Sequence, residues 1–259
     1  MNTVSIERVG ESIAILKLDR PKALNALSTE LLQELNESVN EIKKDSSIRV
    51  VILTSAGEKA FCVGADLKER KQMPEEQVIH AVQLIGQTVS NLEALPQPVI
   101  AAMNGVAFGG GLELALACDI RLAANDISLG LTETALAIIP GAGGTQRLSR
   151  LIGISKAKEL IYTARRITAE TAMELGVVDY VVKREELIAS AIDLANEMAK
   201  NGPLALVQAK KAINQGIEVP LQSGLQIELL AYSALIPTSD RLEGLKAFEE
   251  KRSPNYKGK

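Results

Sequence analysis

A glycine run leads into an almost wholly apolar segment in the stretch Phe108-Gly-Gly-Gly-Leu-Glu-Leu-Ala-Leu-Ala-Cys-Asp119. This pattern is typical of a helix that enters the protein interior. Glu113 lies in the first turn of the expected helix, close to backbone amides that have no partner within it. One interpretation is that Glu113 only complements the positive end of the helix dipole. Because a buried charge is costly unless it is paired or hydrogen-bonded, the apolar setting favours a functional carboxylate.

A second glutamate, Glu133, stands in Leu131-Thr-Glu-Thr-Ala-Leu-Ala-Ile-Ile-Pro-Gly-Ala-Gly-Gly-Thr-Gln-Arg-Leu148. The glycines at 141–144 lack the G-x-G-x-x-G spacing and the lysine of nucleotide-binding loops. They predict instead a bent backbone close behind Glu133. If the two glutamates lie near each other in the fold, they form a carboxylate pair with altered pKa values.

The composition excludes several classes of protein. The chain has 259 residues, of which 46% are hydrophobic, so we expect one large domain or a domain with an appendage. A net charge of −3 argues against electrostatic capture of nucleic acid or of a membrane surface. No stretch is long enough to span a membrane, and strand-like residues 3–8 follow Met1 almost directly, so we expect a cytoplasmic protein.

The cysteines and the histidine do not predict a metal site or a thiol nucleophile. Cys62 and Cys118 are too few for a zinc site or a disulfide framework, and neither has a histidine in its motif. We interpret both as small buried packing residues. His80 follows an acidic stretch and is expected on the surface of a helix. No metal is therefore predicted.

Hydrophobic periodicity predicts an α/β protein with a repeating strand-strand-helix order. Asn201 marks the expected boundary between an α/β core, residues 1–200, and a helical region, residues 201–259, that is broken at Gly216, Pro220 and Pro237. We expect strands at 3–8, 13–18, 50–54, 99–103, 120–123 and 177–182, and helices at 29–44 (capped by Ser28), 77–92, 111–117, 155–163, 169–174 and 185–200.

Two glycine-containing loops carry backbone amides that are suited to bind an oxygen. The first lies in Lys59-Ala-Phe-Cys-Val-Gly-Ala-Asp-Leu-Lys68, and the second in Asn104-Gly105 and Gly109-Gly110-Gly111. Missing side chains let a ligand approach the backbone closely, and two amides aimed at one point polarise a carbonyl as an oxyanion hole. Either loop alone is better interpreted as a tight turn.

Together these segments resemble the crotonase superfamily, and specifically its enoyl-CoA hydratases. The resemblance extends from Leu18-Asp-Arg-Pro-Lys-Ala-Leu-Asn-Ala26 to Phe248-Glu-Glu-Lys-Arg252. It implies a spiral of repeated ββα units with a C-terminal helical region that forms trimers, often paired into hexamers. It also implies an acyl-CoA thioester substrate, with coenzyme A as part of the substrate and no separate cofactor.

The resemblance assigns roles to individual residues. The amides of Ala65 and Gly110 would form the oxyanion hole, Glu113 would act as base toward water, and Glu133 would supply the proton to C2. The amide of Gly141 would help to fix the water. Because superfamily members that isomerise, decarboxylate or dehalogenate their substrates usually lack one of the two glutamates, the presence of both favours hydration. The residues that the resemblance places at CoA are Lys22, Lys59, Val63, Ala65, Asp66, Leu67 and Lys68, with Phe248 and Lys251 arriving from a neighbouring subunit.

Three details bear on the choice among related functions. The segments 130–139, 212–216 and 236–244 resemble the 3-methylglutaconyl-CoA hydratases of leucine breakdown more than the short-chain fatty acyl enzymes of β-oxidation. A member of that subgroup also binds RNA through lysines of its first long helix. Here the matching helix carries Glu34, Glu37 and Glu41 on the side expected to be exposed, which would repel phosphate. An inactive scaffold is the third alternative, and it conflicts with two intact carboxylates.

Overall fold

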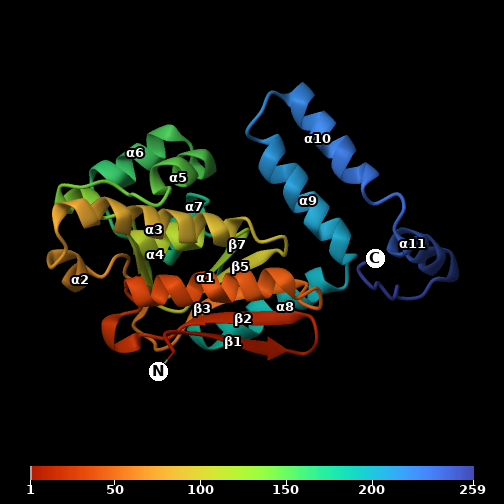
Figure 1. Ribbon diagram of the computed structural model, residues 1–259, viewed down its shortest axis with the longest axis horizontal. Helices are drawn as coiled ribbons and strands as arrows, with labels where there is room; N and C mark the ends of the chain where they lie inside the picture. The colour runs from red at the N-terminus through yellow and green to blue at the C-terminus, as the bar shows by residue number, and fades with distance from the viewer. Residues whose placement is uncertain (1) are drawn as a thin grey trace.

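The computed structural model describes residues 2–259 as an α/β protein followed by a set of helices (Figure 1). Its strands are β1 (Val4–Val9), β2 (Ile13–Leu18), β3 (Val50–Ser55), β4 (Ala60–Cys62), β5 (Val99–Met103), β6 (Val106–Phe108), β7 (Ile120–Ala124), β8 (Ser128–Gly130), β9 (Ile167–Thr168) and β10 (Tyr180–Val182). Its α-helices are α1 (Thr29–Lys44), α2 (Leu67–Lys71), α3 (Glu75–Glu93), α4 (Gly110–Leu116), α5 (Gly144–Ile152), α6 (Ile154–Tyr162), α7 (Ala169–Glu174), α8 (Leu187–Ala199), α9 (Pro203–Gly216), α10 (Leu221–Ser233) and α11 (Ser239–Glu250). Short 3₁₀ helices are η1 (Pro21–Ala23), η2 (Glu133–Leu136) and η3 (Arg184–Glu186).

From β3 to β8, successive strands alternate between two sheets. The larger sheet has the order β1-β2-β3-β5-β7-β10, and the smaller sheet has the order β4-β6-β8-β9. In the pairs β3–β4, β5–β6 and β7–β8, the first strand joins the larger sheet and the second joins the smaller one. Helices follow each pair, which confirms the predicted repeat of two strands and a helix.

Apolar strands make the larger sheet the centre of the core. All residues of β3 and β5 are buried, as expected for parallel strands with both faces covered. Helix α8 packs across β2, β3, β5 and β7, and α1 packs on β1 and β2. Helix α1 begins as predicted, because the Ser28 side chain accepts a hydrogen bond from the Leu31 amide.

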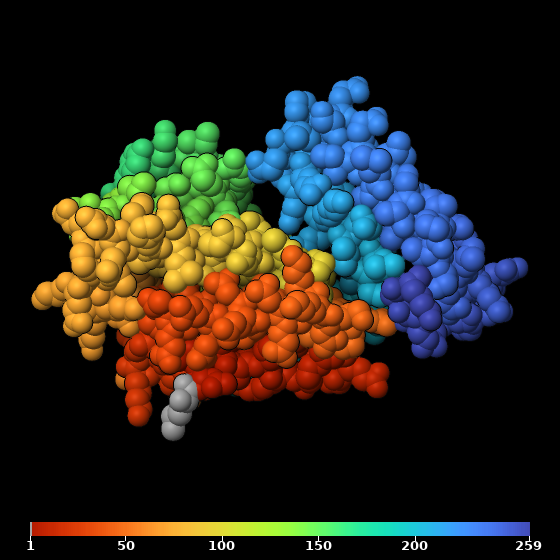
Figure 2. Space-filling model, viewed as in Figure 1, coloured from red at the N-terminus to blue at the C-terminus, as the bar shows by residue number. Residues whose placement is uncertain are grey.

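The last helices extend away from the two sheets (Figure 1). Helices α9 and α10 pack on each other as a hairpin, and the space-filling view shows a hollow between this hairpin and the α5–α6 pair (Figure 2). Side chains of α5 and α9 line a cleft of about 530 Å³ at this place. Among residues 2–259, no helix is long and apolar enough to cross a bilayer.

The structure differs from the sequence-based expectations at several elements. The short strands β6, β8 and β9 and the short helix α2 were not predicted. The last strand begins at Tyr180 instead of 177, because Val177 and Val178 fold back on the end of α7 and their amides donate to the Ala172 carbonyl. Helix α5 and the 3₁₀ helix η2 were not predicted, since both lie in the segment whose glycines indicated only a bent backbone.

Candidate active site

The loops after β4, β6 and β8 meet at one end of the smaller sheet. These strands are neighbours and run parallel, so their carboxyl ends lie side by side. Ligands of α/β proteins commonly bind beyond such strand ends. Here the loops border a cavity of about 570 Å³. Its lining includes most of the predicted site: Val63, Ala65, Leu67, Gly110, Glu113, Glu133 and Gly141.

The two predicted oxyanion amides lie close together. Gly64 has a φ of +85°, and a Cβ built on it would lie 2.9 Å from the Gly110 nitrogen. Only glycine therefore lets the loop after β4 approach the start of α4 so closely. The Ala65 and Gly110 amides donate to no acceptor among residues 2–259. Both N–H groups are thus free to bind an oxygen in the cavity.

Glu113 is a buried carboxylate with a fixed orientation. Its side chain lies in the first turn of α4, and the residue is 2% exposed. Its Oε1 accepts hydrogen bonds from the Ala142 amide at 2.8 Å and from the Gly144 amide at 2.7 Å. Burial raises the pKa of Glu113, whereas these two amides oppose the shift because they stabilise the charged form. The amides at 142 and 144 therefore hold the carboxylate, so Glu113 does more than complement a helix dipole.

Glu133 faces the same cavity but has few partners. It begins η2, and its Oε2 is buried without a hydrogen-bond partner among residues 2–259. Burial, with a further contribution from the charge of Glu113, raises the pKa of Glu133 to about 7. Gly109 lies directly against this carboxylate, since a Cβ there would be 3.0 Å from Glu133 Oε1. Glu133 is thus able to hold a proton near neutral pH.

The cationic residues predicted to contact CoA lie outside the cavity lining. Lys22, Lys59 and Lys68 are exposed, so nothing within the chain fixes their position. Phe248 is 88% exposed on α11, and Lys251 follows that helix; neither lines the cavity of its own chain. The Asp66 carboxylate caps α2 and pairs with Arg20 at 3.2 Å.

The structure also shows site residues that the sequence pattern did not indicate. Arg70 is the cationic side chain among those that line the cavity, and Val78, Val82 and Ile85 of α3 form an apolar wall. The amides of Ala142 and Gly144 were missed as partners of Glu113. The glycine spacing at 141–144 was the available signal, because it places several unobstructed amides in one turn.

The solvent exposure of the two cysteines and of the histidine agrees with the expectations from the sequence. Cys62 and Cys118 are buried, and burial raises the pKa of each thiol to about 12, which agrees with packing roles. His80 is exposed on α3.

The expectation that Glu34 is exposed was wrong. Its carboxylate is half-buried and accepts from the Thr3 amide at 2.6 Å and the Thr3 hydroxyl at 2.9 Å. The start of β1 thus covers part of the α1 face, and Glu37 and Glu41 remain exposed on that helix.

Comparison with known proteins gives consistent matches over the whole chain. A family model described as enoyl-CoA hydratase/isomerase matches residues 8–259. The putative enoyl-CoA hydratase/isomerase YngF of Bacillus subtilis is 58% identical over 96% of this chain and 95% of its own length. The mitochondrial methylglutaconyl-CoA hydratase of Homo sapiens is 48% identical over 98% of this chain and 76% of its own length. A crystal structure of enoyl-CoA hydratase from Bacillus anthracis superposes with a TM-score of 0.98, at 57% identity, over 99% of this chain and 100% of the other.

Proposed function

This chain belongs to the enoyl-CoA hydratase/isomerase family and is a hydro-lyase, and we propose that it adds water to a 2-enoyl-CoA thioester with Glu113 and Glu133 as its catalytic residues. The product is the 3-hydroxyacyl-CoA. One observation carries the proposal: two carboxylates with different surroundings and two free amides face a single cavity. Acid and base roles need such differently tuned groups.

The proposed reaction uses each group once. Glu113 takes a proton from a water molecule while the water oxygen bonds to C3. The electrons of the double bond move to the thioester oxygen, which the amides of Ala65 and Gly110 stabilise as it becomes an enolate. Glu133 then gives its proton to C2. A pKa of about 7 supports this donor role, since the group is half protonated near neutral pH.

We assign the remaining predicted contacts to the same site. The Gly141 amide is proposed to help hold the attacking water, because Gly141 lines the cavity beside Ala142. The CoA contacts proposed are those of Lys22, Lys59, Lys68 and the segment 63–67, of which Val63, Ala65 and Leu67 border the cavity. Coenzyme A is part of the substrate, and the mechanism needs no separate cofactor.

Arg70 favours an acidic acyl chain, and therefore 3-methylglutaconyl-CoA, as a second candidate substrate. Its guanidinium forms no hydrogen bond or ion pair with any residue of the described chain, although it borders the cavity. An unpaired guanidinium next to an apolar wall suits an acyl chain that ends in a carboxylate. The human relative named methylglutaconyl-CoA hydratase supports this substrate. A preference for it would place the enzyme in leucine breakdown, whereas a preference for crotonyl-CoA would indicate β-oxidation.

We expect Arg70→Gln to lower kcat/KM for 3-methylglutaconyl-CoA by about tenfold to a hundredfold, because a charge-assisted hydrogen bond contributes roughly 1.5–3 kcal/mol. Hydration of crotonyl-CoA, which has no second carboxylate, should change little. The loss of enoyl-thioester absorbance measures both rates. Lys71→Gln is the matched control, since Lys71 is exposed and does not border the cavity. An equal change with both substrates would show that Arg70 does not read the acyl carboxylate.

We propose that the enzyme is a homo-oligomer, a trimer or a dimer of trimers, with residues 1–200 as the catalytic core and 201–259 as the oligomerisation region. Exposed apolar side chains on the α9–α10 hairpin support a second copy as their partner: Ile213 (68%), Ile217 (79%), Leu221 (77%) and Leu230 (71%). Phe248, on the following helix, would reach the CoA of a neighbouring subunit.

Light scattering is expected to give the molar mass of a trimer or hexamer for the intact chain. Replacing Leu221 and Leu230 together by Ser should shift the mass toward the monomer, because both side chains lose their apolar contact with the partner. Exchange of the exposed Glu37 and Glu41 for Gln is the control and should leave the mass unchanged. A monomeric wild-type enzyme would contradict the proposal.

We also propose a cytoplasmic location, which the Bacillus subtilis relative supports, and cell fractionation is its test. RNA is not among the proposed partners, because Glu37 and Glu41 give the exposed face of α1 a negative charge. No membrane partner is proposed.

A further inference from the structure

The loop that holds Glu113 is itself held by an arginine. Arg147 lies in the first turns of α5, and its Nη1 donates to the Ala142 carbonyl at 2.9 Å. The amide of the same residue, Ala142, donates to Glu113 Oε1 at 2.8 Å. Ala142 is therefore fixed on one side by the carboxylate and on the other by the guanidinium.

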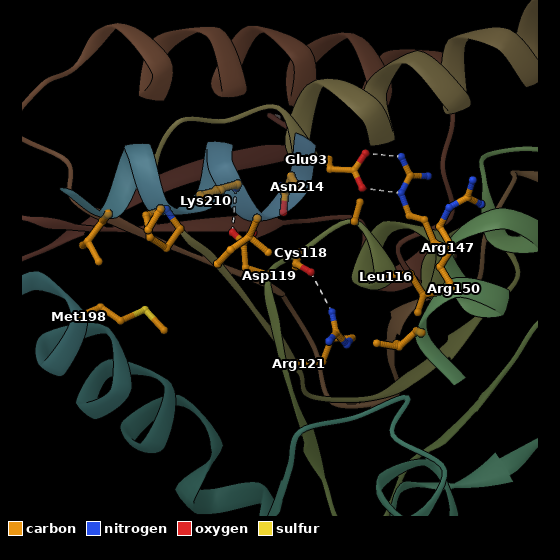
Figure 3. A pocket seen from close by; sticks show the side chains of 16 residues that line it. Glu93, Leu116, Cys118, Asp119, Arg121, Arg147, Arg150, Met198, Lys210 and Asn214 are labelled. Atoms are coloured by element: carbon orange, nitrogen blue, oxygen red, sulfur yellow. Dashed lines mark hydrogen bonds and ion pairs between the residues drawn. The ribbon is translucent and has the colours of Figure 1, made fainter. Parts of the chain in front are cut away.

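Glu93 fixes the guanidinium in turn. Arg147 Nε donates to Glu93 Oε1 at 2.8 Å, and Nη2 donates to Oε2 at 2.6 Å, a bidentate arrangement that Figure 3 shows at the edge of the α5–α9 cleft. Glu93 is the last residue of α3. The Arg147 side chain is 16% exposed and the Glu93 side chain is 41% exposed, so the pair is shielded from solvent on the Arg147 side only. The bidentate Arg147–Glu93 pair connects the end of α3 to the loop before α5.

Gly143 gives independent evidence that the guanidinium is built into the loop. Its φ is +98°, and a Cβ added there would overlap Arg147 Nη1. The side chain of Arg147 thus occupies the space that glycine leaves open between Ala142 and Gly144. Those two residues supply both amides that bind Glu113.

We propose that Arg147, oriented by Glu93, is a positioning residue that sets the direction and the charge environment of the Glu113 carboxylate. This inference rests on the proposed role of Glu113 as the base. Arg147 forms no hydrogen bond with the carboxylate. It acts on the direction of the carboxylate through the backbone of Ala142, and on its charge environment through the positive charge of the guanidinium. A displaced loop would turn the base away from the water, and small misplacements of catalytic groups are costly in rate.

The charged groups around Glu113 allow the role to be tested by pH. They are Glu133 from η2, Arg147 from α5 and, in the cavity lining, Arg70 from α2. The positive charge of Arg147 acts to lower the pKa of Glu113, against burial, which raises it. Removing that charge should therefore raise the pKa of the base. The acid limb of kcat/KM, where Glu113 must lose its proton, should move to higher pH.

The experiment compares Arg147→Met, Arg147→Lys and Glu93→Gln with the wild-type enzyme on crotonyl-CoA. Arg147→Met is expected to lower kcat by about tenfold to a hundredfold with little change in KM, and to move the acid limb to higher pH. Arg147→Lys keeps the positive charge but loses the bidentate hydrogen bonds to Glu93. Its kcat should therefore fall, while the acid limb of its pH profile should stay at the wild-type pH. Glu93→Gln should lower kcat less than Arg147→Met does. It replaces Arg147→Met as the test of the positioning role if that variant does not fold.

Arg150→Met is the matched control. Arg150 lies on the same helix and borders the same cleft, but its guanidinium binds Glu218 and Gln146 instead of the Ala142 carbonyl. Its kcat and pH profile should equal those of the wild type. If the wild-type enzyme is active and Arg147→Met and Glu93→Gln leave kcat and the acid limb unchanged, the positioning role is wrong. A wild-type enzyme that hydrates neither crotonyl-CoA nor 3-methylglutaconyl-CoA would overturn the proposed function, and this inference with it.

Discussion

Glu113→Gln is expected to lower kcat about a thousandfold while KM for crotonyl-CoA stays nearly constant, since the loss of one proton-transfer group commonly costs 10²–10⁴ in rate. The fold should survive the change. A glutamine oxygen is still able to accept the hydrogen bonds that Oε1 now receives from the amides of Ala142 and Gly144. Steady-state kinetics measures the effect, and circular dichroism checks the fold.

Glu133→Gln is expected to cause a similar loss of turnover for the opposite reason, because it removes the proton donor. The pH profile separates the two roles. The Glu133 carboxyl has a pKa of about 7, so it loses its proton as pH rises, and kcat/KM of the wild type should fall above that value. The residual activity of Glu133→Gln should lack this alkaline limb. A variant with normal turnover and weak binding would contradict the assigned roles.

Gly110→Pro is expected to lower kcat by about 10²–10³, the cost of removing one oxyanion-hole donor in other enzymes. Proline has no N–H, so only the Ala65 amide would remain to stabilise the enolate oxygen. Gly110 is the first residue of α4, a position where helices tolerate proline, so the helix itself should still form. Kinetics with crotonyl-CoA and a thermal melt of the same sample measure activity and folding together.

Gly110→Ala is the matched control because it keeps the N–H. A Cβ at this position would lie 3.1 Å from the Leu27 Cδ1 methyl and 3.4 Å from Gly64 Cα. The methyl group has to move by only a few tenths of an ångström, so a moderate loss of activity is expected. If alanine and proline reduce kcat equally, crowding explains the loss and the amide of Gly110 is not an oxyanion donor.

Local sequence patterns predicted most of the fold because their signals are strong and short in range. The alternation of apolar runs gave the strand β2 and the helix α1 with their observed bounds, and Ser28 marked the start of that helix. The glycine run before Glu113 correctly indicated a buried helix. The first turn of a helix has backbone amides without a partner in the helix, so the position of Gly110 and Glu113 in that turn predicted a free amide near a carboxylate.

The same local patterns could not predict contacts between segments that are distant in the sequence. Glu34 looked exposed on the helix, yet Thr3, directly before β1, donates two hydrogen bonds to its carboxylate. The amides of Ala142 and Gly144 bind a carboxylate in another repeat, and Arg70 enters the cavity from a helix with no distinctive motif. The contacts of Glu113 and Arg70 depend on how the parallel strands of the smaller sheet align their loops, and the contact of Glu34 depends on how β1 packs against α1; no local spacing records either arrangement.

The account as a whole is tested most directly by incubating the purified wild-type enzyme with crotonyl-CoA and, in a parallel sample, with 3-methylglutaconyl-CoA, while the enoyl-thioester absorbance is followed and the product mass is measured by mass spectrometry. We predict that the absorbance falls and that the product is heavier than the substrate by one water molecule, with almost no conversion by Glu113→Gln in the same time. An unchanged absorbance with both substrates, or products of unchanged mass, would contradict hydration by Glu113 and Glu133.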